Sequence, residues 1–262
     1  MKYLLLVCND GLPASDAEEA LVGETIGDHI EAIADINLFG HPLQNPSTAR
    51  TVRVRDEELL VADGPFVETK EHIAGFCLLE CETREQAIAA AATHPLAWFN
   101  MLEVRPLAAD ADALLTPEAL QRLEQGPEAG KQRFMLMICS DGVATEAKAE
   151  AMRRELPRWL EEMKVTGSLV AGARLEGPSS ACLVRVRGPH TLVSEGPFAE
   201  TKEFIAGFDV IDCSGPEEAV AIAAKHPVAW FHTIEVRPFT PRMCNEPDPQ
   251  EEAQGAVVQP SV

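Results

Sequence analysis

The stretch Asp63-Gly-Pro-Phe-Val-Glu-Thr-Lys-Glu-His-Ile-Ala-Gly-Phe76 occurs a second time in this chain of 262 residues. The later copy, 132 residues further on, reads Glu195-Gly-Pro-Phe-Ala-Glu-Thr-Lys-Glu-Phe-Ile-Ala-Gly-Phe208, and eleven of the fourteen residues are identical. Agreement of this length at one fixed offset indicates an internal duplication. Fold and function therefore have to be inferred from two copies of one unit.

The similarity extends well beyond this stretch. At the same offset, Glu103-Val-Arg-Pro106 falls on Glu235-Val-Arg-Pro238. Residues 2–11 match residues 133–142 at an offset of 131, so one insertion or deletion lies in the region that follows. Each copy is long enough for its own hydrophobic core, and the period is far longer than that of a solenoid repeat. We therefore expect two domains.

The segment between the copies has a helix of its own. Thr116-Pro117-Glu118 combines an N-cap residue, a proline at the first helical position and an acidic first turn, and Gly126 ends the pattern. After the second copy, Pro, Glu, Asp and Gln dominate, which predicts a disordered acidic tail. The expected organisation is module one at residues 1–107, a helical linker at 108–132, module two at 133–239 and a tail at 240–262.

Apolar runs bounded by turn residues predict the strands of the first copy. One helix follows the first strand, and a second helix precedes the last strand. Thr83 with Gln86 is predicted to cap this second helix, as Ser214 with Glu217 is in the second copy. The expected strands are residues 2–8, 36–43, 51–55, 59–62, 73–82 and the segment around Glu103.

This order of elements predicts an α+β fold. Strand, helix, strand, an inserted hairpin, strand, helix and strand fit a ferredoxin-like sheet with both helices on one face. The other face of such a sheet needs a partner. Because the two copies are tethered, we expect their sheets to pair within one chain as a pseudo-dimer. Whether the whole chain forms a further homodimer is left open by the sequence.

Composition and charge exclude several classes of partner. The chain has 22 Lys and Arg against 42 Asp and Glu, a formal charge of −20, which disfavours nucleic acid and anionic membranes. No apolar run approaches the length of a membrane span, and the N-terminal apolar run is too short for a signal peptide, so a cytoplasmic protein is expected. The seven cysteines show no C-x-x-C spacing, which favours buried reduced thiols over disulfides or a zinc site.

Asp63-Gly-Pro-Phe-Val-Glu-Thr-Lys-Glu71, the Ile-Ala-Gly-Phe that follows it, and Glu103-Val-Arg-Pro106 resemble the signature of the DGPF branch of the YCII-related family. The resemblance covers about residues 1–107 and 132–239. It implies that the two tandem ferredoxin-like modules form an intrachain dimeric α+β barrel. It also implies kinship with small lyases, isomerases, dehydrochlorinases and monooxygenases, which often use no cofactor.

The chain departs from the family pattern in two places that concern function. Glu195 replaces the motif's Asp in the second copy. The wider family is thought to use a His and Asp pair with its His near the first helix. His29 is the only histidine in that region, and counting along the chain puts Glu161 at the matching place of the second copy. If His29 acts, the resemblance implies that only the first copy is competent.

The repeated motif carries the main candidate acids and bases. Asp63 and its counterpart Glu195 either hold a carboxylate at the mouth of a pocket or form a turn whose Phe anchors the loop. Strand alternation would put Glu68 and Lys70 on one face, where we expect either an acid–base pair in a dry cavity or a solvated ion pair. The corresponding residues of the second copy are Glu200 and Lys202.

Histidines and arginines supply further candidates. His94 and His226 precede a proline at a helix end, where an imidazole acts as a proton shuttle or caps the helix. Arginines at alternating strand positions could bind a substrate carboxylate in bidentate fashion or neutralise neighbouring acids. These candidate substrate-binding residues are Arg53, Arg55 and Arg105 in the first copy and Arg185, Arg187 and Arg237 in the second.

The sequence supports three hypotheses and no cofactor. No phosphate loop, H-E-x-x-H or G-x-S-x-G motif is present, and the scattered histidines give no metal-ligand spacing. The first hypothesis is a cofactor-independent lyase or isomerase acting on a small molecule, with a pocket in each half lined by the motif's acid and lysine. The second is a non-catalytic metabolite-binding or regulatory module. The third is that the repeated motif only holds the two sheets together.

Overall fold

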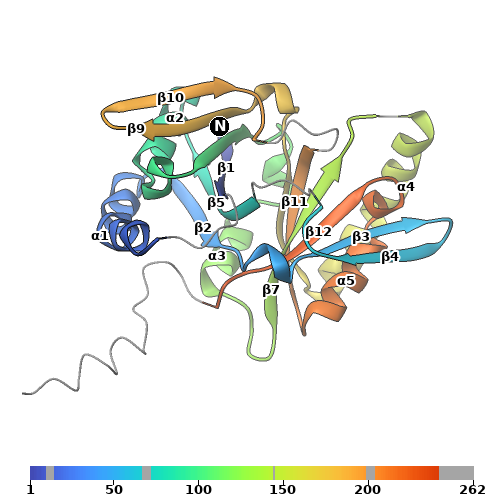
Figure 1. Ribbon diagram of the computed structural model, residues 1–262. Coiled ribbons are helices and arrows are strands. Elements are labelled where there is room, and N and C mark those ends of the chain that lie inside the picture. Colours follow the sequence, from blue (N-terminus) through green and yellow to red (C-terminus); the bar gives the residue numbers. More distant parts are fainter. Residues whose placement is uncertain (10–14, 67–71, 144, 199–203, 242–262) are drawn as a thin grey trace, which may run out of the picture.

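The computed structural model describes residues 1–9, 15–66, 72–143, 145–198 and 204–241 (Figure 1). It confirms the predicted α+β class. Two six-stranded sheets, with every paired strand antiparallel, lie face to face, and helices cover their outer sides. None of the helices in the described ranges is both long enough and apolar enough to span a bilayer.

The two halves repeat one order of elements. The first half consists of β1 (Lys2–Asn9), α1 (Asp16–Ala32), β2 (Asn37–Pro42), β3 (Arg50–Arg55), β4 (Glu58–Asp63), β5 (His72–Glu80), α2 (Arg84–Thr93) and β6 (Met101–Pro106). The second half consists of β7 (Gln132–Ser140), α4 (Glu146–Thr166), β8 (Leu169–Arg174), β9 (Cys182–Arg187), β10 (His190–Glu195), β11 (Phe204–Cys213), α5 (Pro216–Lys225) and β12 (Thr233–Pro238). Short 3-10 turns η2 (Pro95–Trp98) and η5 (Pro227–Trp230) follow α2 and α5.

The halves exchange their hairpins. The strand order is β10-β9-β6-β1-β5-β2 in one sheet and β4-β3-β12-β7-β11-β8 in the other. Leu102 of β6 therefore pairs with Val184 of β9, and Ile234 of β12 pairs with Val52 of β3. Each hairpin lies on the helical layer of the other half, as Figure 1 shows for β9 and β10 beside α2 and for β3 and β4 beside α5. The two modules are thus interlocked.

The space between the sheets holds one hydrophobic core. On β1, Leu4 and Leu6 point into this core while Leu5 points to the helices, the alternation expected of a strand buried on both faces. The two sheets close on each other through the bridges Leu43 to Phe239 and Leu107 to Leu175. This arrangement confirms the intrachain α+β barrel.

The linker helix is part of that core. Helix α3 (Pro117–Gln125) begins after Thr116, whose side chain accepts the Ala119 N–H, and ends at Gly126, as the sequence predicts. Ala119 and Leu123 are buried in the core between the sheets. Helix α3 contacts β2 of the first half and β8 of the second, so the segment that joins the modules also packs against both.

The predicted cap of the last helix is wrong by one residue. Helix α5 begins after Gly215, which has no side chain to cap it, and Ser214 donates both its N–H and its hydroxyl to Glu218 rather than pairing with Glu217. In the first half Thr83 caps α2 as predicted. A serine next to a glycine offers two possible start positions, and the proline at the first helical position of α5 selects the glycine.

Candidate functional site

The acidic residues that open the repeated motif lie on the surface. The Asp63 side chain is 87% exposed and its carboxylate lies 3.2 Å from the Arg50 guanidinium, on the edge strand β4. Glu195 on β10 is paired with Arg84 at 2.7 Å in the same exposed manner. The following Gly64 has φ of +94°, a value that strongly favours glycine. Both carboxylates therefore face solvent rather than a binding cavity.

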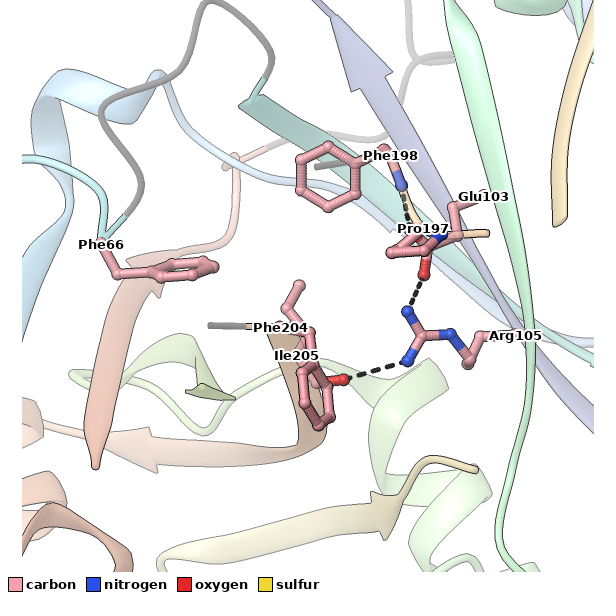
Figure 2. A pocket seen from close by; sticks show the side chains of 7 residues that line it. All are labelled: Phe66, Glu103, Arg105, Pro197, Phe198, Phe204 and Ile205. Atoms are coloured by element: carbon pink, nitrogen blue, oxygen red, sulfur yellow. Dashed lines mark hydrogen bonds and ion pairs between the residues drawn. The ribbon is translucent and has the colours of Figure 1, made fainter. Parts of the chain in front are cut away.

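The phenylalanine of each motif is held by the opposite half. Figure 2 shows the Phe198 N–H donating to the Glu103 carboxylate at 2.8 Å, and Glu103 in turn paired with Arg105. The guanidinium of Arg105 also donates to the carbonyl of Ile205 at 3.3 Å. Both ionic side chains are only 1% exposed. Burial raises the pKa of Glu103, while Arg105 and the Phe198 N–H oppose the rise.

The other half repeats this arrangement with the roles exchanged. The Phe66 N–H donates to Glu235 at 3.0 Å, Glu235 pairs with Arg237, and Arg237 donates to the carbonyl of Ile73 at 3.0 Å. We call each set of contacts a latch; the first consists of Glu103, Arg105 and Phe198 and the second of Glu235, Arg237 and Phe66. The latches explain why the Glu-Val-Arg-Pro and Gly-Pro-Phe segments are retained together, because each segment binds its counterpart across the two halves.

A small cavity lies beside the first latch. Phe66, Phe198 and Phe204 line it together with Arg105 (Figure 2). Its room for a water-sized molecule is only about 10 Å³, which is enough for one water at most. The Nε of Arg105 is buried without a hydrogen-bond partner in the described part of the chain. The cavity is too small for a substrate.

Three of the candidate arginines on the hairpins, Arg53, Arg55 and Arg187, bind the opposite half. Arg53 on β3 donates to the Thr233 hydroxyl at 2.6 Å, and Arg55 donates to the Ala229 carbonyl at 2.8 Å. On β9, Arg187 donates to the carbonyl of Trp98, and Arg185 is half-buried. The structure therefore places Arg53, Arg55 and Arg187 at the contact between each hairpin and the other half.

The second carboxylate and the lysine of the motif cannot be placed. Glu68, Lys70, Glu200 and Lys202 lie outside the described residues. Their assignment as acids and bases stays a prediction.

A large open cavity runs along the β2 edge of the first half's sheet, from α1 and η2 on the helical side round to the segment that follows α3 and to the end of β12. Its volume is about 880 Å³, within the range of small-molecule sites. On the helical side the lining is mainly apolar, with Val22 and Ile26 from α1 and Leu96 from η2, and on the other side of β2 it includes Phe39 and Phe239. The polar groups that line it on the helical side are few and include His29, His94 and the thiol of Cys77.

Hydrogen bonds fix the tautomers of both histidines. The Thr93 hydroxyl donates to the Ala90 carbonyl at 2.8 Å, so it must accept from Nδ1 of His29, which lies 2.8 Å away. His29 Nε2 therefore carries a lone pair, and this atom is buried without a partner in the described ranges. His94 Nδ1 accepts the Leu96 N–H at 3.2 Å, which leaves the proton on its Nε2.

The two rings are in contact and are neutral. Their centroids lie 4.7 Å apart in an edge-to-face arrangement. Burial lowers the pKa of His29 to about 4, and burial together with the neighbouring His29 lowers the pKa of His94 to about 3. Near neutral pH this part of the cavity thus presents an unprotonated nitrogen as hydrogen-bond acceptor and a ring N–H as donor.

The second half has a filled site in the same place. The Trp159 indole contacts the His226 ring edge-to-face at 4.5 Å, as His29 contacts His94. Trp159 is 3% exposed and packs in the core of its half. Trp159 thus corresponds to His29, and the match with Glu161 expected from the sequence is wrong because it counts residues across the insertion or deletion.

The residues beside the two histidines also differ between the open site of the first half and the filled site of the second. Asp209 takes the place of Cys77, and its Oδ2 lies 3.7 Å from Nε2 of His226. Burial raises the pKa of Asp209 to about 7 and lowers that of His226 to about 3. His226 Nδ1 accepts the Val228 N–H, so this histidine caps η5 as His94 caps η2.

A model of the YCII-related domain matches residues 39–111 and 133–241, well over half of the chain. The chain belongs to the YCII-related domain family. An uncharacterised protein of Rhizobium meliloti (strain 1021) is 38% identical over 74 residues, which are 28% of this chain and 60% of the relative. A solved structure provisionally assigned as the chlorite dismutase TA0507 aligns over 98% of this chain and 99% of its own, with 8% identity and a TM-score of 0.43.

Within this YCII-related fold, the sequence pointed to His29 and His94 but missed their surroundings. The sequence patterns mark Cys77 only as part of a strand and assign no role to Trp159. A signal was available, because aligning His29 with Trp159 requires an offset of 130 and also matches Ile33 with Met163, both of them buried. Aligning the two helices by the period of their apolar positions, rather than by the residue count between the motifs, would have matched His29 with Trp159.

Proposed function

We propose that this protein binds a small molecule in the cavity of its first half and acts there as a cofactor-independent enzyme of the lyase or isomerase type. The observation that supports this most directly is Nε2 of His29, which is buried in the wall of a largely apolar cavity and has no hydrogen-bond partner among the described residues. An unsatisfied buried acceptor costs about 1–3 kcal/mol, so a donor from a bound molecule would relieve a real penalty. In this proposal the second half contributes strands to the scaffold but binds no substrate, because Trp159 fills the equivalent space.

The apolar lining and the two neutral histidines suit a substrate that has an apolar body and a removable proton. His29 Nε2 accepts the proton, and the Thr93 hydroxyl keeps the ring in the required tautomer. The His94 Nε2–H is a donor for an oxygen on which charge develops. A neutral acceptor next to a neutral donor favours a hydroxyl or a ketone over a carboxylate.

One observation favours a second candidate, a non-catalytic metabolite-binding or regulatory module. With a pKa of about 4, His29 is a weak base in the unoccupied cavity, which suits hydrogen bonding better than proton removal. The latches support the further view that the repeated motif serves the interface between the halves, since both Gly-Pro-Phe segments are tied there.

Binding is tested by calorimetry with phenol and benzoate near neutral pH. The proposal expects phenol to bind and benzoate to bind at least tenfold more weakly, because benzoate has no proton to donate to His29. His29→Gln should weaken phenol binding about fivefold, in keeping with a hydrogen bond worth about 1 kcal/mol. The matched control is His226→Gln in the closed half, which should leave phenol binding unchanged. Equal binding of phenol by the His29→Gln variant would refute the proposed site.

Catalysis is tested separately by exchange of the α-hydrogens of cyclohexanone in D2O, followed by NMR. An isomerase-type site accelerates this exchange in the wild type and loses the acceleration in His29→Gln. Phenol binding without accelerated exchange would select the non-catalytic module.

A further inference from the structure

Cys77 is the described cysteine that a small molecule can reach. Six of the seven cysteines are described, and none of the six is in a disulfide. Cys77 on β5 is partly exposed and lines the large cavity, whereas the others are buried. Burial raises the pKa of Cys81, Cys182 and Cys213, which keeps those thiols protonated and unreactive.

The internal repeat shows where the Cys77 side chain points. Cys77 pairs with Gly40 of β2, and Asp209 pairs in the same register with Gly172 of β8. A Cβ added to either glycine would meet that partner's side chain, the Cys77 Sγ at 3.0 Å and the Asp209 Oδ1 at 2.3 Å. Both side chains therefore leave the sheet on the helical side.

This side of the sheet also carries the histidines. In the second half the Asp209 carboxylate lies 3.7 Å from Nε2 of His226. In the first half His94 takes the place of His226, so the repeat places the Cys77 thiol next to His94, whose ring contacts that of His29. An independent observation points to a ligand here, because His29 is 3% exposed and its Nε2, in the wall of the same cavity, has no partner in the part of the chain described.

We propose that Cys77 is a nucleophile that captures α,β-unsaturated carbonyl compounds in this cavity. The thiolate sulfur forms a bond to the β-carbon, the carbon–carbon π bond breaks, and its electrons move to the carbonyl oxygen as an enolate. The proton that leaves the thiol is held on Nε2 of His29 and then returns to the α-carbon. Atoms and electrons balance without an oxidant, a reductant or a metal. The inference rests on the proposed function only in that the cavity admits small molecules.

The test uses N-ethylmaleimide as the electrophile and the full chain in a Cys244→Ser background, because Cys244 lies outside the described residues. Labelling is followed by intact mass and peptide mapping. We expect one adduct per chain, on Cys77, formed at least tenfold faster than any adduct on Cys81 or Cys182. Cys77→Ser should abolish the adduct, and His29→Gln should slow it at least threefold without changing labelling of the denatured chain.

A second variant tests the role of the open cavity. Asp209→Cys introduces a thiol at the equivalent place under Trp159, and it should resist labelling in the folded protein; a thermal melt establishes that this variant folds. Labelling of Cys77 no faster than that of Cys182, or labelling of the introduced thiol as fast as that of Cys77, overturns the proposal. So does an unchanged rate in His29→Gln. If Cys77→Ser still binds phenol while the wild type is not labelled, covalent capture fails and the proposed binding site stands. If the wild type is labelled on Cys77 but no phenol binds, the proposed binding site alone is rejected.

Discussion

Removal of Glu235 should strongly destabilise the protein, because its buried carboxylate pairs with Arg237 and also binds the other half. Glu235 and Arg237 are 2% and 1% exposed, and Glu235 also accepts the N–H of Phe66 from the other half. Glu235→Ala leaves a buried guanidinium without its counter-ion and a backbone N–H without its acceptor. Breaking a buried pair in this way costs about 3–5 kcal/mol. At roughly 2–4 °C per kcal/mol for a chain of this size, the melting temperature should fall by about 10 °C.

The measurement is urea unfolding followed by tryptophan fluorescence, with a second probe to check that the transition is two-state. Two controls sharpen it. Asp63→Ala removes an exposed ion pair and should change stability by no more than about 1 kcal/mol. The double variant Glu235→Met with Arg237→Met removes both buried charges and should recover much of the loss. A cost below about 1 kcal/mol for Glu235→Ala, or a double variant less stable than the single one, would show that the latch does not stabilise the pairing of the halves.

Three more outcomes follow from the packing and the titrations. Trp159→Ala should cost about 3–5 kcal/mol in chemical unfolding and give the second half a cavity, detectable as a second site for phenol; a single site in this variant would contradict the assignment of Trp159 as the filler. Buried His226 should make the protein less stable as the pH falls below about 6.5, because its folded pKa is about 3 and protons then bind preferentially to the unfolded chain; Asp209, with its pKa raised to about 7, acts in the opposite direction. His226→Gln should remove a contribution of up to about 1.4 kcal/mol per pH unit to the pH dependence of the unfolding free energy between pH 6.5 and 4. An unchanged pH dependence in this variant would contradict a buried neutral imidazole. Gly207→Ala should be poorly tolerated, since its Cβ would lie 2.8 Å from the Ala173 carbonyl oxygen, whereas Gly27→Ala on the open face of α1 meets nothing within 4 Å and should be neutral or stabilising in a thermal melt.

The sequence predicted the order of strands and helices because local patterns decide it. The apolar run at residues 2–8 and the Thr116-Pro117 start of α3 are both found in the structure. Duplication also predicted that two sheets pair within the chain. These features depend on neighbours in sequence or on the repeat itself, and both are visible in one sequence.

What the sequence could not predict depends on residues far apart in the chain. Nothing in residues 50–63 indicates that their hairpin joins the sheet of the other half, because strand alternation is the same in either sheet. For Arg105 and Arg237 the sequence leaves open whether they bind a substrate or neutralise neighbouring acids, since an arginine on a strand says nothing about its own burial; the structure pairs them with Glu103 and Glu235. The open cavity escaped prediction because α1 has shorter side chains, such as Val22 and His29, at the positions that Met152 and Trp159 take in α4, and only an alignment of the two helices reveals this.

The exchange of hairpins has a consequence for how the two halves can change. A chain cut within the linker would yield two fragments that each lack a pair of strands, so neither half is expected to persist alone. The sheets depend on both halves, whereas the proposed function needs only one cavity. The second half can therefore hold a buried indole at Trp159 as long as its β9–β10 hairpin still completes the sheet of the first half.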